Sequence, residues 1–454
     1  MRRLSESVNG RIFTALVMIT ALASLVRIFS LAKEMFIARI FGAGDALDAF
    51  YVALLLPVFL GYIVNSLGSA FVPTYIQVRE TEGDLAAQRV FSSVAAFNLA
   101  ALLGLSLLLA VTAQWLLPII GSGFSPEKLA LTRNLFFLSL GLLLANGFSM
   151  LWRAVLNARE HFALTALAPI MNPVIIVVVI VATSGSRRIY ALALGTVLGT
   201  VGELVITGYG LLRRGIPIIP RWYGLTGPVR QVLGQTAPVA AGAILLSANI
   251  LIDQSMATML GSGSVAVLNY ANKLVSPLLS IGVFSLATAI LPTFSRLSAN
   301  QEWTGLRRVL NTYTNLIALV TVPLTTALII FSEPLIATFF QGGAFSVQDA
   351  HLVARVQSML FLQLPFYSLA MLYVTAITSL RRNQILMWGT TISISVNILL
   401  NFLFMRIFGL PGIALSTSCV LLVAFLYLRF MLMLTLKEHE ATEARSTCTV
   451  AATV

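Results

Sequence analysis

The chain has 454 residues, of which 58% are hydrophobic and 10% are charged, and its mean hydropathy is +0.91. Soluble globular domains contain about 25% charged residues, so this composition excludes a soluble globular protein as well as a disordered one. Two cysteines and three histidines exclude a disulfide framework and a Cys- or His-rich metal centre. The net charge of +12 is typical of the cytoplasmic loops of a membrane protein and gives no reason to expect nucleic acid as a partner.

A membrane-spanning helix needs about 20 mostly apolar residues, and runs of this kind predict about twelve spans. In chain order the predicted spans are 12–40, 46–75, 88–118, 130–155, 163–183, 189–212, 228–258, 263–292, 308–331, 350–376, 385–405 and 411–434. With the N-terminus inside, 19 Lys and Arg residues fall in inner segments and 7 in outer segments. This excess predicts that both termini are cytoplasmic.

The chain repeats itself at an offset of 219 residues. The matching positions include two glycine pairs, a Pro-Thr pair and an acid: Gly42 and Gly44 match Gly261 and Gly263, Pro73-Thr74 matches Pro292-Thr293, and Glu34 matches Asp253. Because six predicted spans separate the copies, the repeat predicts two six-helix lobes related by a pseudo-two-fold axis along the membrane normal, as in transporters. We expect an N-terminal lobe at 1–220, a C-terminal lobe at 221–435 and a disordered cytoplasmic tail at 436–454.

Ionisable residues inside spans cost about 2.5–3.5 kcal/mol each, so they indicate functional positions. Six such residues stand out on the first, second, seventh and eighth predicted spans: Arg27, Lys33, Glu34, Asp48, Asp253 and Lys273. One interpretation is an internal salt bridge from Glu34 to Arg27 or Lys33 that holds the first helix in the bundle. The other is a cavity between the lobes in which Arg27, Lys33 and Lys273 bind an anionic head group. A phosphate or diphosphate fits, because Arg supplies a bidentate fork and Lys a point charge.

A second group carries oxygen atoms in otherwise apolar spans. It consists of Asp253 in the seventh span, Asn397 and Asn401 one turn apart in the eleventh, and Thr417 in the twelfth. Oxygen ligands suit a hard cation. The alternative is that the two asparagines only cross-link helices through hydrogen bonds.

The segment from Arg27 to Gly44, RIFSLAKEMFIARIFGAG, followed by Asp48-Ala49-Phe50, resembles the first-helix signature of the MurJ/MviN flippases. These belong to a superfamily with the MATE exporters and the polysaccharide flippases. Ala70-Phe71-Val72-Pro73 and Gly261-Ser262-Gly263 with Lys273 are similar as well. The resemblance runs from about residue 10 to 435.

This resemblance implies a MATE-like fold and a transporter that is not an enzyme. Family members move an undecaprenyl-diphosphate-linked saccharide from the inner to the outer leaflet of the bacterial cytoplasmic membrane by alternating access. The substrate would be peptidoglycan lipid II or an exopolysaccharide repeat unit. The expected partners are this lipid-linked glycan, the lipid bilayer and cell-envelope synthesis enzymes.

The resemblance also assigns residues. Arg27 matches an arginine that grips the diphosphate, Lys33 and Lys273 stand where the family has arginines, and Glu34 and Asp48 are expected in cavity salt bridges. An arginine pair of the family is absent here, where Gly61-Tyr62 stands. Some members have a sodium site whose positions match Asp253, Asn397, Asn401 and Thr417, with Asn401 replacing an acid. Sodium is therefore the candidate coupling ion, and no other cofactor is expected.

Two other functions are alternatives to the flippase, and the sequence opposes both. A MATE-like cation-coupled exporter of small organic cations predicts an acidic cavity, which three cations in the spans oppose. A membrane enzyme such as a polyprenyl-phosphate glycosyltransferase needs clustered acids for a divalent metal. The longest predicted loops hold too few paired acids, and the chain has no GxxxxGK[ST] phosphate loop.

Overall fold

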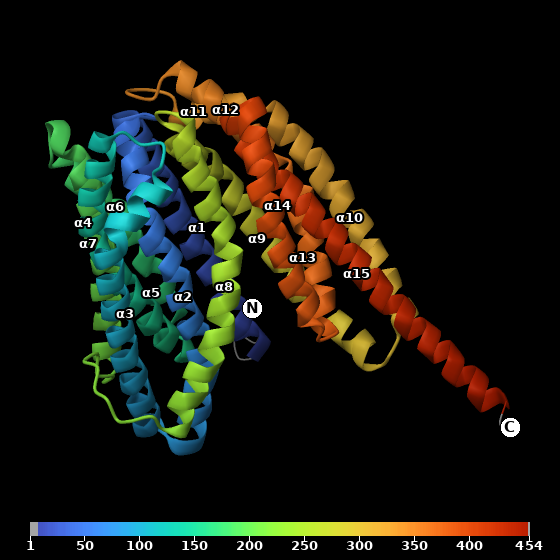
Figure 1. Ribbon diagram of the computed structural model, residues 1–454. Helices are drawn as coiled ribbons and strands as arrows, with labels where there is room; N and C mark the ends of the chain where they lie inside the picture. Colours follow the sequence, from blue (N-terminus) through green and yellow to red (C-terminus); the bar gives the residue numbers. More distant parts are fainter. Residues whose placement is uncertain (1–7, 453–454) are drawn as a thin grey trace. The chain divides into compact units, whose positions relative to one another are not determined.

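The computed structural model describes residues 8–452, without the side chains at 8–16, 64–65, 186, 246, 281–289 and 439–452. Residues 1–7 and 453–454, the ends of the predicted N-terminal lobe and of the predicted tail, lie outside the described residues. The helices are shown in Figure 1. The first half contains α1 (Val8–Phe41), α2 (Asp45–Glu82), α3 (Asp84–Ile120), α4 (Pro126–Ala158), α5 (Phe162–Leu167), η1 (Ala168–Ile170), α6 (Met171–Val181), η2 (Gly185–Arg187) and α7 (Arg188–Leu212). The second half contains α8 (Gly227–Ala257), η3 (Thr258–Leu260), α9 (Ser264–Ala299), α10 (Trp303–Ile330), α11 (Ser332–Phe340), α12 (Val347–Phe361), α13 (Gln363–Ser379), α14 (Asn383–Phe408) and α15 (Leu410–Ala452).

Ten helical segments in the described part of the chain are long and apolar enough to cross a membrane. They are Asp45–Glu82, Asp84–Ile120, Pro126–Ala158, Phe162–Val181, Arg188–Leu212, Gly227–Leu260, Trp303–Ile330, Val347–Ser379, Asn383–Phe408 and Leu410–Glu438. The all-helical membrane fold is therefore confirmed. The two remaining predicted spans fall on the long helices α1 and α9, which are not among these ten, so the count of twelve stays a prediction.

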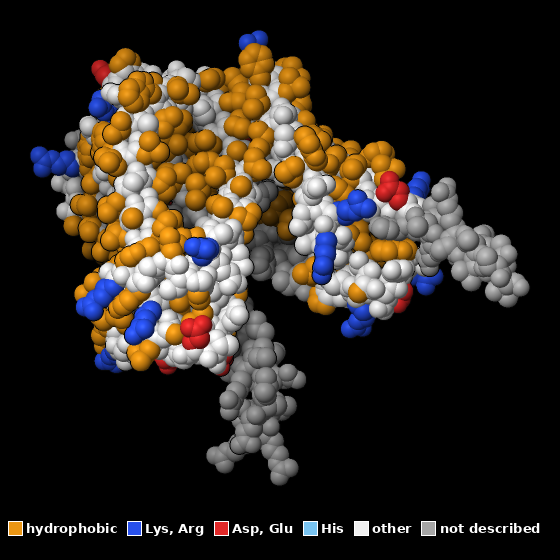
Figure 2. All heavy atoms as spheres, turned by 60° about the horizontal axis from the view of Figure 1, so that its bottom comes forward, with side chains coloured by type: hydrophobic (Ala, Val, Ile, Leu, Met, Phe, Trp, Pro, Cys, Tyr) orange, Lys and Arg blue, Asp and Glu red, His pale blue; other side chains and the backbone are white. Residues whose placement is uncertain are grey.

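Apolar side chains are exposed on these helices, as a lipid-facing surface requires. On α3, for example, Leu107 and Ile119 are about two-thirds exposed, at 67% and 68%. Figure 2 shows hydrophobic side chains spread over most of the face in view. In water such large apolar areas would be unfavourable, whereas hydrocarbon tails of lipids cover them without cost.

The helix boundaries follow the sequence repeat. Helix α1 ends at Phe41 and η3 ends at Leu260, and α2 begins at Asp45 and α9 at Ser264, both at the predicted offset of 219 residues. Gly42 and Gly261, which follow the first pair of ends, both have positive φ angles of 59° and 110°. Glycine adopts such angles readily, but the two turns differ: Gly44 is extended, with a φ of −120°, whereas its counterpart Gly263 is left-handed, with a φ of 79°.

The chain divides into two compact units, each described here by itself. Unit 1 contains residues 1–247 and 342–344, and unit 2 contains residues 248–341 and 345–454. In unit 1, α4 packs against both α2 and α7, and α7 packs against α6. An aromatic group in its core places the ring of Phe71 5.2 Å from that of Tyr75 and 6.2 Å from that of Phe91. In unit 2, α15 packs against α13 and α14.

Glycines bring α6 and α7 into backbone contact. A Cβ atom added to Gly199 of α7 would lie 2.7 Å from the Cα atom of Asn172, and one added to Gly195 would lie 3.0 Å from the Cα atom of Ile176. The spacing of four residues places both glycines on the same side of α7. Small residues at this spacing let membrane helices approach closely and pack without a side chain between them.

We expect Gly199→Ala to lower the free energy of unfolding by about 1–3 kcal/mol, because the new methyl group forces two backbones apart. Thermal unfolding of the purified protein in detergent measures this loss. Gly104→Ala on α3 is the matched control, since nothing lies within 4 Å of the added Cβ atom. Equal melting temperatures for the two variants would contradict the close contact of α6 and α7.

Candidate functional site

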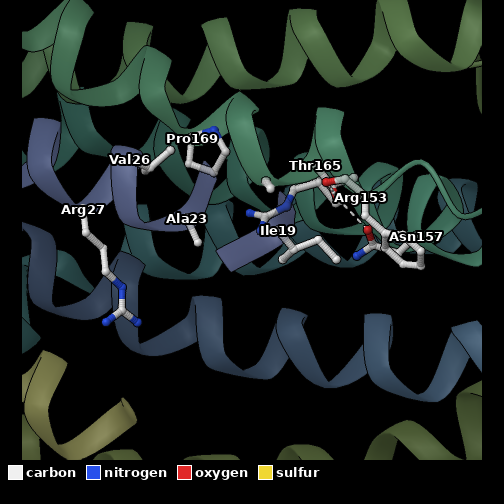
Figure 3. Close-up of a pocket in the computed structure, with 10 residues that line it drawn as sticks. Ile19, Ala23, Val26, Arg27, Arg153, Asn157, Thr165 and Pro169 are labelled. Atoms are coloured by element: carbon white, nitrogen blue, oxygen red, sulfur yellow. Dashed lines mark hydrogen bonds between the residues drawn. The ribbon is translucent and has the colours of Figure 1, made fainter. Parts of the chain in front are cut away.

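A pocket of about 390 Å³ lies within unit 1 (Figure 3). Four elements line it: Ile19, Ala23, Val26 and Arg27 come from α1, Arg153 and Asn157 from α4, Phe162, Thr165 and Ala166 from α5, and Pro169 from η1. The α1 residues recur every three or four positions, which places them on one helix face. From Ile19 to Arg27 this face extends about 12 Å along the helix axis. The pocket is therefore an elongated groove along α1.

The pocket has a cationic side chain towards each end. In Figure 3, Arg27 and Arg153 lie apart, with Ala23 between them. Arg153 Nη1 donates to Glu203 Oε1 of α7 at 3.0 Å, and Ser149 Oγ donates to the same oxygen at 2.9 Å. Glu203 thus holds the guanidinium of Arg153 and balances its charge.

Asn157 and Thr165 form the polar wall beside Arg153. Thr165 Oγ1 donates to Asn157 Oδ1 at 2.6 Å and joins α5 to α4. His161 directly precedes the lining residue Phe162 and lies before the predicted span. Burial, followed by the charges of Arg214 and Arg159, lowers the pKa of His161 below its usual value. His161 is therefore neutral near pH 7 and adds no charge beside the pocket.

Glu34 forms an ion pair with its neighbour on α1. Lys33 Nζ lies 2.8 Å from Glu34 Oε1, and Glu34 is only 6% exposed. Lys33 was one of the two partners that the sequence allowed for Glu34. Whether Lys33 also binds an anion stays a prediction, as does the same role for Lys273, which lies half-buried on α9 of unit 2.

Asp48 is fully buried and pairs with a lysine from another helix. Lys128 Nζ in the first turn of α4 lies 2.7 Å from Asp48 Oδ2 and 2.6 Å from Asp45 Oδ1, both in the first turn of α2. The same ammonium group lies 4.1 Å from the ring centre of Phe124. Lys128 lies outside the predicted spans and 80 residues from Asp48, so the sequence did not predict this contact.

The structure brings the four oxygen-bearing residues of unit 2 together. Asp253 Oδ1 accepts hydrogen bonds from Asn397 Nδ2 at 3.0 Å and Asn401 Nδ2 at 2.6 Å, and Thr417 Oγ1 donates to Asp253 Oδ2 at 3.0 Å. Both asparagines are fully buried. Among the described residues, Asn401 Oδ1 has no hydrogen-bond partner, although it is buried. The residues that the structure describes contain no cluster of three or more His, Cys, Asp or Glu side chains suited to a metal ion.

Arg153 and Glu203 are not among the site residues predicted from the sequence. Glu203 lies inside the predicted span 189–212, so the rule that singled out Glu34 could have found it. Arg153 lies near the end of the span 130–155, where a long basic side chain can equally reach the membrane surface. The position of Arg153 in the sequence therefore did not show whether its side chain lines a pocket or lies at the membrane surface.

Comparisons with known sequences identify close relatives in one family. The family model described as lipid II flippase MurJ matches residues 37–454. The chain is 28% identical over 429 residues to the lipid II flippase MurJ of Burkholderia cenocepacia, which covers 89% of this chain and 80% of that protein. It is 25% identical over 420 residues to the probable lipid II flippase MurJ of Buchnera aphidicola, covering 91% of this chain and 82% of that protein.

Solved structures show the same fold. A lipid II flippase MurJ in an inward closed conformation matches with a TM-score of 0.77 at 22% identity, over 92% of this chain and 87% of that chain. An inward-facing multidrug resistance MATE family transporter matches with a TM-score of 0.73 at 16% identity, over 94% and 99%. The predicted MATE-like fold and the predicted family resemblance are both confirmed. Because the family model matches most of its length, the chain belongs to the lipid II flippase MurJ family.

Proposed function

We propose that the protein is a flippase that moves an undecaprenyl-diphosphate-linked saccharide across the membrane by alternating access. The observation that carries the proposal is the pocket that contains Arg27, in a chain whose relatives are lipid II flippases. A guanidinium in a partly apolar pocket favours an oxyanion such as a diphosphate, because it offers charge and paired N–H donors together. The same positive charge disfavours the organic cations of the alternative exporter.

In this proposal the protein resides in the bacterial cytoplasmic membrane with both termini in the cytoplasm, as the excess of inner Lys and Arg residues favours. The substrate enters from the inner leaflet and leaves to the outer one. Cell-envelope synthesis enzymes would supply and consume the lipid-linked precursor. Transport breaks no covalent bond of the substrate, so the protein acts as a transporter and not as an enzyme.

Complementation of bacteria depleted of their own lipid II flippase tests the proposal. Rescue of growth would assign lipid II as the substrate. Failure with the protein present in the membrane, together with loss of secreted polysaccharide in a deletion strain, would assign an exopolysaccharide repeat unit. If growth is not rescued and the deletion strain still secretes its polysaccharide, the flippase function is contradicted.

We also propose that Asp253, Asn397, Asn401 and Thr417 hold a sodium ion as the coupling ion. They supply carboxylate, amide and hydroxyl oxygens, the ligands preferred by hard cations. Asn401 Oδ1 is a buried oxygen without a hydrogen-bond partner in the described part of the chain, and rotation of the Asn401 amide, whose Nδ2 group faces Asp253 here, would turn it to a cation beside Asp253. Asp253 accepts these hydrogen bonds from uncharged donors, which leave its single negative charge to be balanced by a monovalent cation.

We expect Asp253→Asn to abolish the dependence of transport on sodium, because it removes the negative charge of the cluster. The measurement is the flipping rate in proteoliposomes with a sodium gradient and with choline in place of sodium. Ser247→Ala is the matched control on α8, since Ser247 Oγ donates within its own helix to the carbonyl of Ala243. An unchanged sodium response in the Asp253 variant would leave only a role in cross-linking helices.

A further inference from the structure

The Arg153 end of the pocket carries hydrogen-bond donors whose charge is already balanced. Glu203 is buried, on α7, and accepts from both Arg153 and Ser149. Its pairing engages Nη1 of Arg153, whereas a guanidinium has five N–H donors in all. The side chain of Arg153 is 32% exposed and lines the pocket. It therefore presents further donors to a ligand from a fixed position and with little net charge.

Asn157 adds donors one helical turn away. Its carbonyl oxygen accepts from Thr165 Oγ1, so its amide Nδ2 group is the part that remains for a ligand. Arg153 and Asn157 are four residues apart on α4 and line the same pocket. Their Cβ atoms are therefore about 5–6 Å apart on one helix face, from which both side chains reach the pocket.

Apolar side chains line the space between the two ends of the pocket. Ile19 and Ala23 of α1 and Phe162 and Pro169 of the opposite segment are among the lining residues. Small-molecule sites typically combine such apolar walls with a few polar groups that fix orientation. A sugar ring matches this pattern, because its C–H faces are apolar and its rim carries hydroxyl and acetamido oxygens. A second phosphate matches it less well, since Glu203 already cancels the charge of Arg153.

We propose that the Arg153 end of the pocket is a sugar subsite, in which Arg153 and Asn157 donate hydrogen bonds to oxygens of the saccharide attached to the diphosphate. This inference rests on the proposed flippase function and deepens it, because it assigns the two ends of the pocket to different parts of the substrate. Arg27 serves the diphosphate, and Arg153 and Asn157 serve the neighbouring saccharide. Glu203 and Ser149 are positioning residues that hold Arg153 in place.

Binding of two lipids that differ only in the sugar tests the subsite. The purified protein in lipid nanodiscs is titrated with undecaprenyl diphosphate and with an undecaprenyl-diphosphate-linked saccharide. We expect Arg153→Gln to weaken binding of the saccharide-bearing lipid about tenfold and to leave undecaprenyl diphosphate binding unchanged, because one charge-assisted hydrogen bond to the sugar is lost. Arg27→Gln should weaken both lipids. Arg133→Gln is the matched control, an exposed arginine on the same helix.

Since Arg153→Gln leaves the buried Glu203 without its cation, the double variant with Glu203→Gln is measured beside it. This variant keeps the charge balance and should show the same selective loss. Equal weakening of both lipids, or no weakening of either, in the two Arg153 variants would overturn the sugar subsite while Arg27 still supports the flippase. If the unaltered protein binds neither lipid, the proposed function fails and the subsite fails with it.

Discussion

Arg27→Ala is expected to reduce transport of the lipid-linked precursor by about ten- to hundredfold while the protein still inserts into the membrane. Hydrogen bonds to charged groups contribute about 1.5–3 kcal/mol each, which corresponds to this range of rates when the bond is made to the moving diphosphate. Arg27 is exposed on α1 at the edge of the pocket. Shortening an exposed side chain leaves the helix packing intact, so stability should change by less than about 0.5 kcal/mol.

The measurement combines growth of flippase-depleted bacteria with flipping by the purified variant in liposomes. Arg27→Lys keeps the charge but loses the bidentate fork, so its rate should fall between those of the unaltered protein and the alanine variant. Arg133→Ala removes an arginine that lies over the Phe137 ring on the exposed side of α4, and it should transport normally. Normal flipping by Arg27→Ala would exclude the diphosphate role of this residue.

The largest loss of stability is expected for Lys128→Met. This change leaves Asp48, which is fully buried, without the ammonium group that lies 2.7 Å from its carboxylate. Removing one partner of a buried ion pair typically costs about 3–5 kcal/mol. The amount of folded protein in membranes and the melting temperature in detergent should both fall sharply.

Two further variants separate the charge effect from the loss of packing. Asp45 is exposed, and Asp45→Asn should cost no more than about 1 kcal/mol. The double variant Lys128→Met with Asp48→Asn removes both buried charges and should recover much of the lost stability. If the double variant melts as low as Lys128→Met alone, the loss comes from packing of the lysine stem and not from the broken ion pair.

The sequence predicted those features in which a buried polar group has few possible hydrogen-bond partners. Asp253 is an acid within an apolar helix, and such a group must find polar partners inside the protein. The asparagines at i and i+4 on α14 and the hydroxyl of Thr417 were the polar groups available, and all three donate to Asp253. The repeat was equally predictable, because a glycine with a positive φ angle follows both α1 and η3.

The pocket could not be predicted in the same way. Its polar contacts join residues far apart in the sequence, such as Arg153 and Glu203, which are 50 residues apart. A charged side chain near the end of a span can be stabilised in two ways, because it reaches either the membrane surface or a buried partner. Sequence position alone does not choose between them, and the choice depends on which helices pack together.

The two copies of the repeat place an acid at the same position but in different electrostatic surroundings. Glu34 and Asp253 occupy equivalent places in the two copies. In the first copy the acid lies against the ammonium group of its neighbour Lys33, whereas in the second it is held by two amides and a hydroxyl, which carry no charge. The two halves of the repeat are therefore not electrostatically equivalent: the first pairs its acid with a cation fixed on the same helix, and the second holds its acid with neutral dipoles alone.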